Sequence, residues 1–468
     1  MGCGLAGVGL AGQNAAMQSP SPEPRPRFSL SLVLIGFALV ATLLQLPLIL
    51  NPGYFSHDEL QWAARADVAP GMPFPWESWF GWRTFQFRPL TFNLWLLLLQ
   101  ALFRTPMAFH ALWVLLGTGN AVLLLRLMRR LKIAMRPALL FAFGFALGPY
   151  AAFTHGWVAT LADLSWVGFG LILAQALLWA GDNPARRWPA GALAFVLTTL
   201  ALLSKESAIV LPALIALTWL LAGRPRLLRD AAMFSALPVL IYLALRLNVI
   251  LFTPRAAGIY GWSLWSIPRQ WLLYQLFPLM PSQSEINSML TMSSRHLWFA
   301  GLFWLSLTAL VFRASTRAGW LLLVGGAIAL GPVLLLEMPS DQYGYGFAAI
   351  TMLALAWAWT AMGRAGRSLA VLFVLIGVWH GVNVQRELRH DGQLQAHFSP
   401  ALAQAVAEAS HTPIRLRLPQ DHPWVYQRLT HEIPSYGGVA IGDRVRLVGE
   451  GETADFIIAT DGSLTKTP

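Results

Sequence analysis

The apolar residues of this chain occur in long blocks separated by short polar segments. A helix needs about 20 residues to cross the hydrocarbon layer of a bilayer, and in lipid its backbone must be hydrogen-bonded internally. The pattern therefore predicts an all-α polytopic membrane protein with about eleven transmembrane helices. The predicted spans cover residues 28–50, 107–127, 137–153, 158–180, 189–203, 208–222, 230–252, 298–313, 318–336, 347–362 and 368–385.

Lysine and arginine concentrate before the first span and in every second linker. If the N-terminus is cytoplasmic, all of these clusters face the cytoplasm, as the positive-inside rule expects. The surplus of 33 Lys and Arg over 22 Asp and Glu is then explained by topology, and no nucleic-acid partner is needed. The clusters lie at residues 25–27, 126–136, 186–187, 224–229, 313–317 and 364–367.

The linker after the first span contains an apolar stretch, residues 88–103, that we predict to lie along the outer membrane surface. If this stretch crossed instead, the topology would shift by one span. Within the transmembrane domain (28–385), residues 51–106 and 253–297 form large extracytoplasmic loops. Residues 1–27 are expected to be a disordered cytoplasmic N-terminus. Their Cys3 is the single cysteine, which excludes an intrachain disulfide and a cysteine-based metal cluster.

The composition changes at residue 386, and residues 386–468 hold eight Lys or Arg and ten Asp or Glu. We predict a small soluble α/β domain, which the span count places on the extracytoplasmic side. The segment SPALAQAVAEAS predicts a separate helix with Ser399 as N-cap and Pro400 in its first turn. The segments IRLRL, RVRLV and ADFIIAT predict short strands.

Polar residues also gather in the linkers on the side opposite the basic ones. Ionisable groups near hydrocarbon are costly, so they indicate function by default. The spans flanking Lys205 are too short for two full crossings, so this turn is expected to sink to the depth of the lipid phosphates. There Lys205 either contacts a ligand or pairs with Glu206 and reaches the headgroups.

Five segments, in order along the chain, together resemble the motifs of GT-C glycosyltransferases of the O-mannosyltransferase-like branch. They are SHDEL (56–60), FRPL (87–90) with the helix that follows it, THGWVATLADLS (154–165), LLSKESAIVLP (202–212) and SDQYGYGFAAI (340–350). The resemblance covers about residues 28–385. The chain differs from that branch at Leu161 and Gln342, where the family has arginine, and it lacks the tetratricopeptide repeats.

The resemblance implies transfer of a sugar from a polyprenyl-phosphate donor to an acceptor hydroxyl on the extracytoplasmic side. Such a transfer needs a base near the acceptor and cations near the leaving phosphate. Asp58 is the candidate base, and a single displacement would invert the anomeric configuration. Glu59 would position the acceptor or, with Asp58, hold a divalent cation, although the resemblance favours a reaction without a metal or other cofactor.

The remaining candidate residues are assigned by charge. The residues expected to bind the donor phosphate are Arg83, Arg88, Lys205 and Arg255. The residues expected to bind substrate are His57, His155, Asp163, Glu206, Asp341, Tyr343 and Tyr345. His110, at the start of a span, fits a structural hydrogen bond as well as a site role.

The expected function is therefore that of a multi-pass glycosyltransferase, placed in the inner membrane if the source is bacterial. Its partners would be a polyprenyl-phosphate-linked sugar, membrane lipids, and an acceptor that is a protein, a lipid or a glycan. Two alternatives remain open. One is a transporter or flippase of lipid-linked sugars, although inverted repeats and interrupted central helices are not evident in the sequence. The other is an inactive GT-C-like scaffold.

Overall fold

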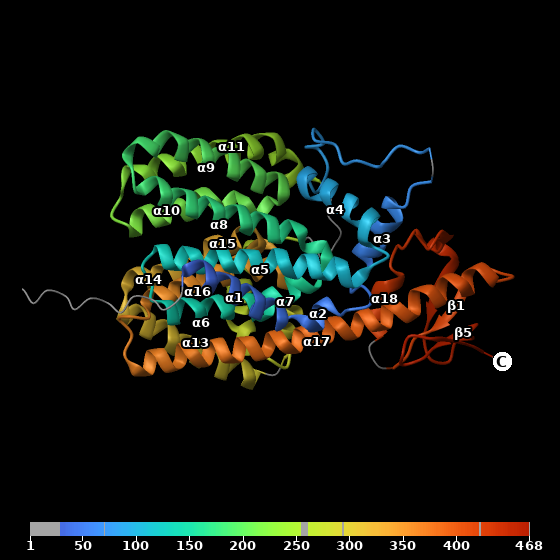
Figure 1. Cartoon of the computed structure of the whole chain (residues 1–468). Coiled ribbons are helices and arrows are strands. Elements are labelled where there is room, and N and C mark those ends of the chain that lie inside the picture. The colour runs from blue at the N-terminus through green and yellow to red at the C-terminus, as the bar shows by residue number, and fades with distance from the viewer. Residues whose placement is uncertain (1–28, 70, 254–260, 293, 421–422, 468) are drawn as a thin grey trace, which may run out of the picture.

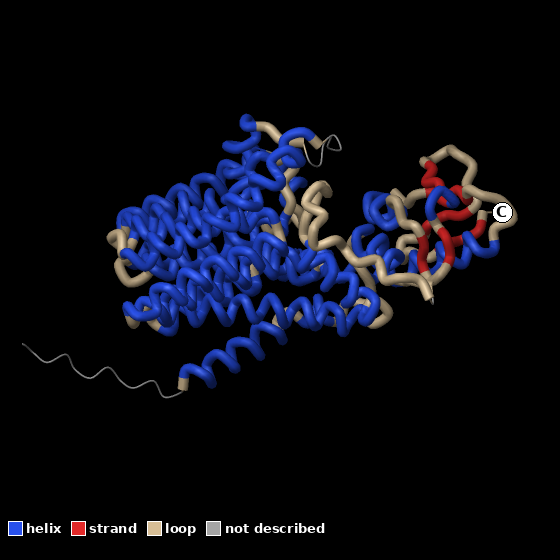
Figure 2. Tube along the Cα trace, turned by 90° about the horizontal axis from the view of Figure 1, so that it is seen from above, coloured by secondary structure: helices blue, strands red, loops and turns tan. Residues whose placement is uncertain are grey.

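The computed structural model describes residues 29–69, 71–253, 261–292, 294–420 and 423–467. The chain is mostly helical. Figure 1 shows long helices side by side in a bundle with a small strand-containing part at one end, and Figure 2 shows the same division from above. The helices are α1 (Leu30–Leu43), α2 (Leu46–Ile49), α3 (His57–Ala66), α4 (Pro89–Leu102), α5 (Pro106–Arg130), α6 (Met135–Leu147), α7 (Pro149–Gly156), α8 (Leu161–Gly181), α9 (Arg187–Ser204), α10 (Leu211–Leu221), α11 (Arg226–Phe252), α12 (Ile267–Leu276), α13 (Ser294–Ala314), α14 (Thr316–Trp320), α15 (Gly326–Leu330), α16 (Gly344–Ala358), α17 (Arg364–Glu408) and α18 (Pro423–Thr430).

Each predicted span contains a helix, but the count of eleven full-length spans is not confirmed. Among the described residues, seven helical segments are long and apolar enough to cross a membrane, and an eighth results if α6 and α7, bent by 49°, count as one. The other spans are short or broken. Prolines explain three of these interruptions, because α2, α7 and α10 each begin with a proline in the first turn, where the ring cannot continue a preceding helix. The seven segments are Pro106–Arg130, Val158–Gly181, Arg187–Ser204, Arg226–Phe252, Arg295–Ala314, Thr316–Leu335 and Arg364–Glu408.

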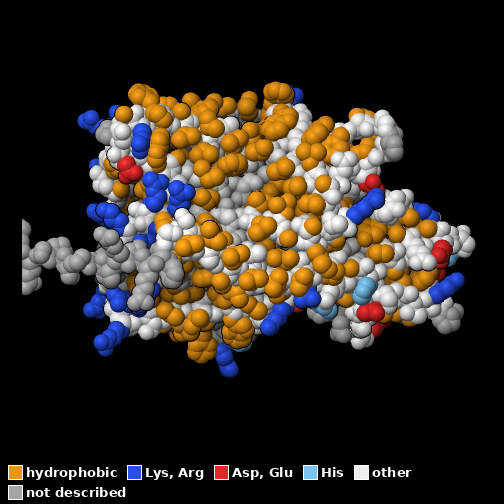
Figure 3. Space-filling model, in the orientation of Figure 1, with side chains coloured by type: hydrophobic (Ala, Val, Ile, Leu, Met, Phe, Trp, Pro, Cys, Tyr) orange, Lys and Arg blue, Asp and Glu red, His pale blue; other side chains and the backbone are white. Residues whose placement is uncertain are grey.

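One end of the bundle carries most of the basic residues, and we call it the basic end. There α5 ends at Arg130, α9 begins at Arg187, α11 begins at Arg226 and α17 begins at Arg364. Figure 3 shows Lys and Arg gathered at this end and a broad belt of hydrophobic side chains over the bundle. The opposite end, which we call the site end, carries α3 and the small strand-containing part.

The apolar stretch 88–103 forms α4, which has 14 residues and is too short for a full crossing. The helix packs against α3 and α9 at the site end. It buries Trp95 and Leu99 in the core and exposes Leu94 and Leu97 on its other face. Its length argues against the alternative in which this stretch forms a full crossing.

The longest helix, α17, runs without interruption for 45 residues from the basic end into the C-terminal part (Figure 1). The predicted separate helix with Ser399 as its cap is therefore wrong, since Ser399 is buried in mid-helix and Pro400 lies inside α17. A proline in a helix interior costs about 3 kcal/mol. Burial of Phe398 and Val406 in the C-terminal core offsets that cost, because a fully buried apolar side chain contributes about 1.5–3 kcal/mol.

The C-terminal part is a small α/β domain, as predicted, and its strands confirm the three segments named from the sequence. A four-stranded sheet has the order β4-β1-β5-β6, with β1 parallel to β4 and β5 and with β5 antiparallel to β6. Helix α18 packs against this sheet and against α3 of the bundle. The strands are β1 (Ile414–Arg417), β2 (Ser435–Tyr436), β3 (Val439–Ala440), β4 (Val445–Val448), β5 (Phe456–Ile458) and β6 (Leu464–Lys466).

Candidate active site

The first turn of α3 holds the candidate base in a fixed position through a capping box. The Ser56 hydroxyl accepts the Asp58 backbone N–H at 3.4 Å, and the Glu59 carboxylate accepts the Ser56 N–H at 2.6 Å. Glu59 is fully buried, which raises the pKa of its carboxyl well above the ordinary value. The geometry therefore gives Glu59 a role in shaping the helix start and leaves Asp58 as the reachable carboxylate.

Asp58 lies at the junction between the bundle and the C-terminal domain. Its side chain keeps 37% of its surface exposed, and its Oδ1 lies 3.5 Å from Nε2 of His57. The His57 ring in turn meets the ring of His431 edge-on, with centroids 5.1 Å apart. Despite the exposed fraction, the surrounding protein removes enough water to raise the pKa of Asp58, against the lowering effect of His57, Arg88 and Arg428.

Arg428, on α18, brings a positive charge from the C-terminal domain to the same place. Its Nη2 donates to Oε1 of Glu285 at 3.0 Å, and its guanidinium lies over the rings of Phe55 and Trp424 at 4.1 and 4.6 Å. The two rings and the carboxylate fix the arginine on three sides. A cation held in this way can act on Asp58 without contacting it.

Four charged residues from distant motifs form two crossed ion pairs beside this junction. Lys205 donates to Asp163 at 2.5 Å, and both side chains are almost fully buried, with 3% and 4% exposed. Arg88 donates to Glu206 at 2.8 Å, with 18% and 26% exposed. The alternative in which Lys205 pairs with Glu206 is therefore not the one found, because Lys205 pairs with Asp163. Lys205 ends α9 in an extended conformation (φ −158°, ψ 139°), which turns its side chain towards α8.

Tyr343 completes this group, because the Lys205 ammonium lies 4.5 Å from the centre of its ring. Arg88 precedes α4, Asp163 lies in the first turn of α8, Lys205 and Glu206 follow α9, and Tyr343 precedes α16. We call these five residues the charged cluster. Four of the five motif segments named from the sequence thus meet at one point of the site end.

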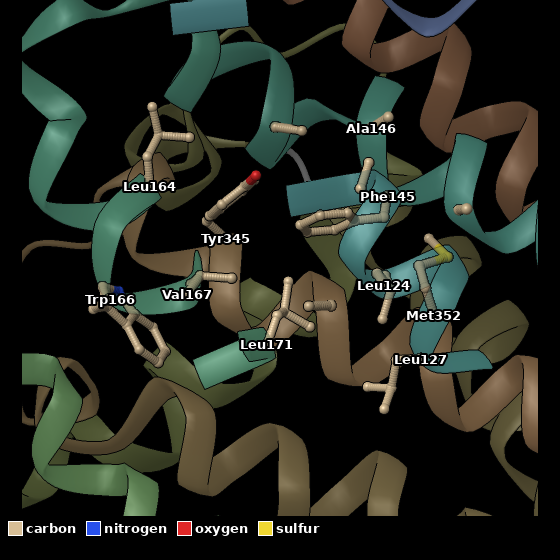
Figure 4. Packing of buried hydrophobic residues seen from close by; sticks show 14 of the residues in the cluster. Leu124, Leu127, Phe145, Ala146, Leu164, Trp166, Val167, Leu171, Tyr345 and Met352 are labelled. Atoms are coloured by element: carbon tan, nitrogen blue, oxygen red, sulfur yellow. The ribbon is translucent and has the colours of Figure 1, made fainter. Parts of the chain in front are cut away.

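His155 and Tyr345 lie deeper, in a buried chain of hydrogen bonds. His155 Nδ1 lies 2.6 Å from Oε1 of Gln45, its Nε2 lies 3.2 Å from the Tyr345 hydroxyl, and Asn120 donates to that hydroxyl at 3.4 Å. Figure 4 shows Tyr345 among apolar side chains that include Leu164. Both predicted substrate-binding residues are fully buried and satisfied by protein groups, so they support the bundle.

The other candidate residues lie outside the charged cluster, and Asp341 lies near the Glu285–Arg428 pair. Asp341 is buried and accepts the backbone N–H of Ile286 at 3.0 Å, and His110 is buried and donates to the Gly53 carbonyl at 2.9 Å. Arg83 is exposed in the segment between α3 and α4. Arg255 lies outside the described residues.

An apolar groove of about 670 Å³ runs along the bundle, and its lining does not include the residues of the charged cluster. It is lined by α5, α8, α10 and α16 and extends from Asp182 to Trp166, one helical turn from Asp163. These limits are 16 residues apart, or about 24 Å at 1.5 Å per residue. Among the described residues, the charged groups of the lining are Asp182 and Arg317, both at the basic end. Several other lining residues are labelled in Figure 4.

Arg428 and His431 were not identified from the sequence, because they reach the site only through the packing of α18 against α3. Nor was Arg246, which donates to the carbonyl oxygens of Trp82, Thr84 and Phe85 at 2.6–2.7 Å. A signal for Arg246 did exist, because an arginine inside an apolar span is rare and needs a partner. No comparable signal marks the other two.

Within the part of the chain that the structure describes, no group of three or more His, Cys, Asp or Glu side chains is arranged to hold a metal ion. Comparison with known proteins gives no further guide: no protein-family model matches the chain, and no curated protein matches its sequence significantly.

Proposed function

We propose that this chain is an integral membrane glycosyltransferase of the GT-C type, which moves a sugar from a polyprenyl phosphate to an acceptor hydroxyl. The observation that carries the proposal is the meeting of Arg88, Asp163, Lys205, Glu206 and Tyr343, from separate motif segments, about one helical turn beyond the end of an apolar groove. A polar cluster near the end of an apolar groove matches the two halves of a lipid-linked sugar phosphate.

The proposed orientation places the basic end in the cytoplasm and the site end outside. It follows the positive-inside rule, with the hydrophobic belt in the bilayer and the short or broken helices completing the eleven crossings. Helix α4, with Leu94 and Leu97 exposed, would lie in the outer interface. Reporter fusions at Arg224 and at the C-terminus should then report opposite compartments, and a shared compartment would contradict this topology.

In this proposal the groove holds the prenyl chain and Arg88 holds the phosphate. Arg88 uses Nε for Glu206, and its terminal nitrogens are the donors that a phosphate would bind in bidentate fashion. Lys205 forms a buried ion pair with Asp163, so in this proposal it stabilises the cluster and does not bind the phosphate. The apolar lining weighs against the flippase alternative, since a sugar-phosphate headgroup moving along the groove would need polar partners throughout.

Asp58 would act as the general base. The acceptor oxygen forms a bond to the anomeric carbon, the bond from that carbon to the phosphate oxygen breaks, and the electron pair stays on the phosphate. The proton of the acceptor hydroxyl passes to the Asp58 carboxylate. A carboxylate whose pKa is raised is a stronger base, and the pKa of Asp58 is raised. The Asp58 side chain is also partly exposed, so an acceptor can reach it.

The test is Asp58→Asn, which keeps the shape of the side chain and removes its basicity. We expect sugar transfer in membranes to fall by about 10²–10⁴-fold, the usual contribution of general-base catalysis. Asp67→Asn, at the exposed C-terminal end of the same helix, is the matched control and should keep the parent rate. Near-normal transfer by Asp58→Asn, at an equal protein level, would exclude the mechanism.

A further inference from the structure

The segment between α3 and α4 exposes an unusual number of large apolar side chains. We call residues 71–87 the aromatic loop. Glu77 and Arg83 are its charged residues, and Glu77 is paired with Arg65 at 2.5 Å. The exposed apolar residues are Met72 (66%), Trp76 (55%), Trp79 (49%), Phe80 (78%) and Phe85 (39%). Contiguous exposed apolar groups of this kind mark an interaction surface.

The position of the loop is fixed by α11. Arg246, 2% exposed, donates three hydrogen bonds to loop carbonyl oxygens, from Trp82 to Phe85. The helix continues beyond Arg246 to Phe252, which is about 9 Å further at 1.5 Å per residue. These last turns expose Leu247, Leu251 and Phe252. The loop is therefore attached at a level where the outer surface of the neighbouring helix is still apolar.

This level decides what covers the loop. Helix α11 is one of the segments long and apolar enough to cross a membrane, and only 28% of its apolar window is buried in the protein. If the exposed side of α11 faces lipid, its last turns reach the headgroup boundary, and the loop lies at the same depth. Tryptophan and phenylalanine are the side chains that favour this boundary, and charged groups are scarce in the loop.

We propose that the aromatic loop inserts Trp79, Phe80 and their exposed neighbours into the outer headgroup–acyl boundary of the bilayer. The loop then places Arg83 at the depth of the lipid phosphates and ends at Arg88 of the charged cluster. A lipid-linked donor moving in the outer leaflet would meet Arg83 before it reaches Arg88. This inference rests on the proposed membrane orientation and adds a lipid contact and an approach path to the proposed site.

The test uses depth-dependent fluorescence quenching on single-cysteine variants. The chain has one cysteine, so the background is Cys3→Ser. An environment-sensitive dye is attached at Phe80→Cys, at Leu240→Cys in the middle of α11 (62% exposed), and at Glu450→Cys on the C-terminal domain. Each labelled protein is reconstituted into phosphatidylcholine–phosphatidylglycerol vesicles that carry bromine at a shallow or a deep acyl position.

The label at Phe80 should lose more emission with shallow bromine than with deep bromine. The label at Leu240 should show the opposite order, and the label at Glu450 should keep its emission with both. Quenching at Leu240 without quenching at Phe80 would overturn this inference and indicate that the loop binds a partner in water. The proposed function would then still stand. No quenching at Leu240 would instead remove the membrane orientation on which both proposals depend.

Discussion

Lys205→Met tests whether the lysine of the charged cluster stabilises the fold or binds the donor. The change removes the counter-charge of Asp163, whose side chain is only 4% exposed. Removing one partner of a buried ion pair costs about 3–5 kcal/mol, because the other charge is left without compensation. At about 1.4 kcal/mol per factor of ten, the unfolding equilibrium constant should rise by roughly two to three and a half powers of ten.

The double variant Lys205→Met/Asp163→Leu should recover most of that loss. It removes both charges, and replacement of a buried ion pair by apolar residues is often neutral or stabilising. Arg88→Gln is the comparison, since its pair with Glu206 is more exposed and its loss should destabilise less. Unfolding in detergent, followed by the fluorescence of the 21 tryptophans, gives the free energies of unfolding of the parent protein and the three variants.

Binding of polyprenyl phosphate is measured on the same four proteins. We expect Arg88→Gln to bind more weakly while it remains folded, and the double variant to be stable and to bind the lipid. If Lys205→Met unfolds like the parent protein, Lys205 does not stabilise the fold through Asp163, because loss of the partner of a buried carboxylate should lower the free energy of unfolding. A stable double variant that has lost lipid binding would instead show that Lys205 itself contacts the donor.

Two further results follow from the geometry. Gly117→Ala places a Cβ against the buried ring of His155 and should destabilise the protein by about 1–3 kcal/mol. Gly119→Ala, on the same helix and with no neighbouring atom within 4 Å of the new Cβ, should be neutral or stabilising by up to about 1 kcal/mol. Equal unfolding curves for the two variants would contradict this. Arg428→Gln removes a charge that lowers the pKa of Asp58, so the acid limb of the pH–rate profile should move to higher pH, and an unmoved limb would show that Arg428 does not act on the base.

The positions of the helices could be predicted because apolar residues mark them directly, but their continuity could not. Pro149 breaks one predicted span between α6 and α7, while Pro400 lies inside the unbroken α17. Proline therefore interrupts the helix in one place and is tolerated in the other, and the difference lies in what the helix packs against. In α17 the apolar stripe continues past Pro400 and packs on the C-terminal sheet, so the helix persists where composition suggested a boundary.

Candidate residues could be named from the sequence, but the contacts between them could not. The partner of Lys205 is set by how α8 packs on α9, and nothing in the local sequence separates Asp163 from the adjacent Glu206. The approach of His431 to His57 joins residues more than 370 positions apart and depends on the fold of the C-terminal domain. Such contacts follow from tertiary packing, which one sequence does not reveal.

Burial separates the residues that can meet a substrate from those that hold the site together. Two cations and two carboxylates make the crossed ion pairs neutral overall, as a poorly hydrated environment requires. Lys205 and Asp163 form a buried ion pair, whereas the side chains of Arg88 and Asp58 are 18% and 37% exposed. Arg88 and Asp58 are therefore the cation and the carboxylate that remain reachable for the transfer proposed above. The buried pair is the frame that keeps them in place.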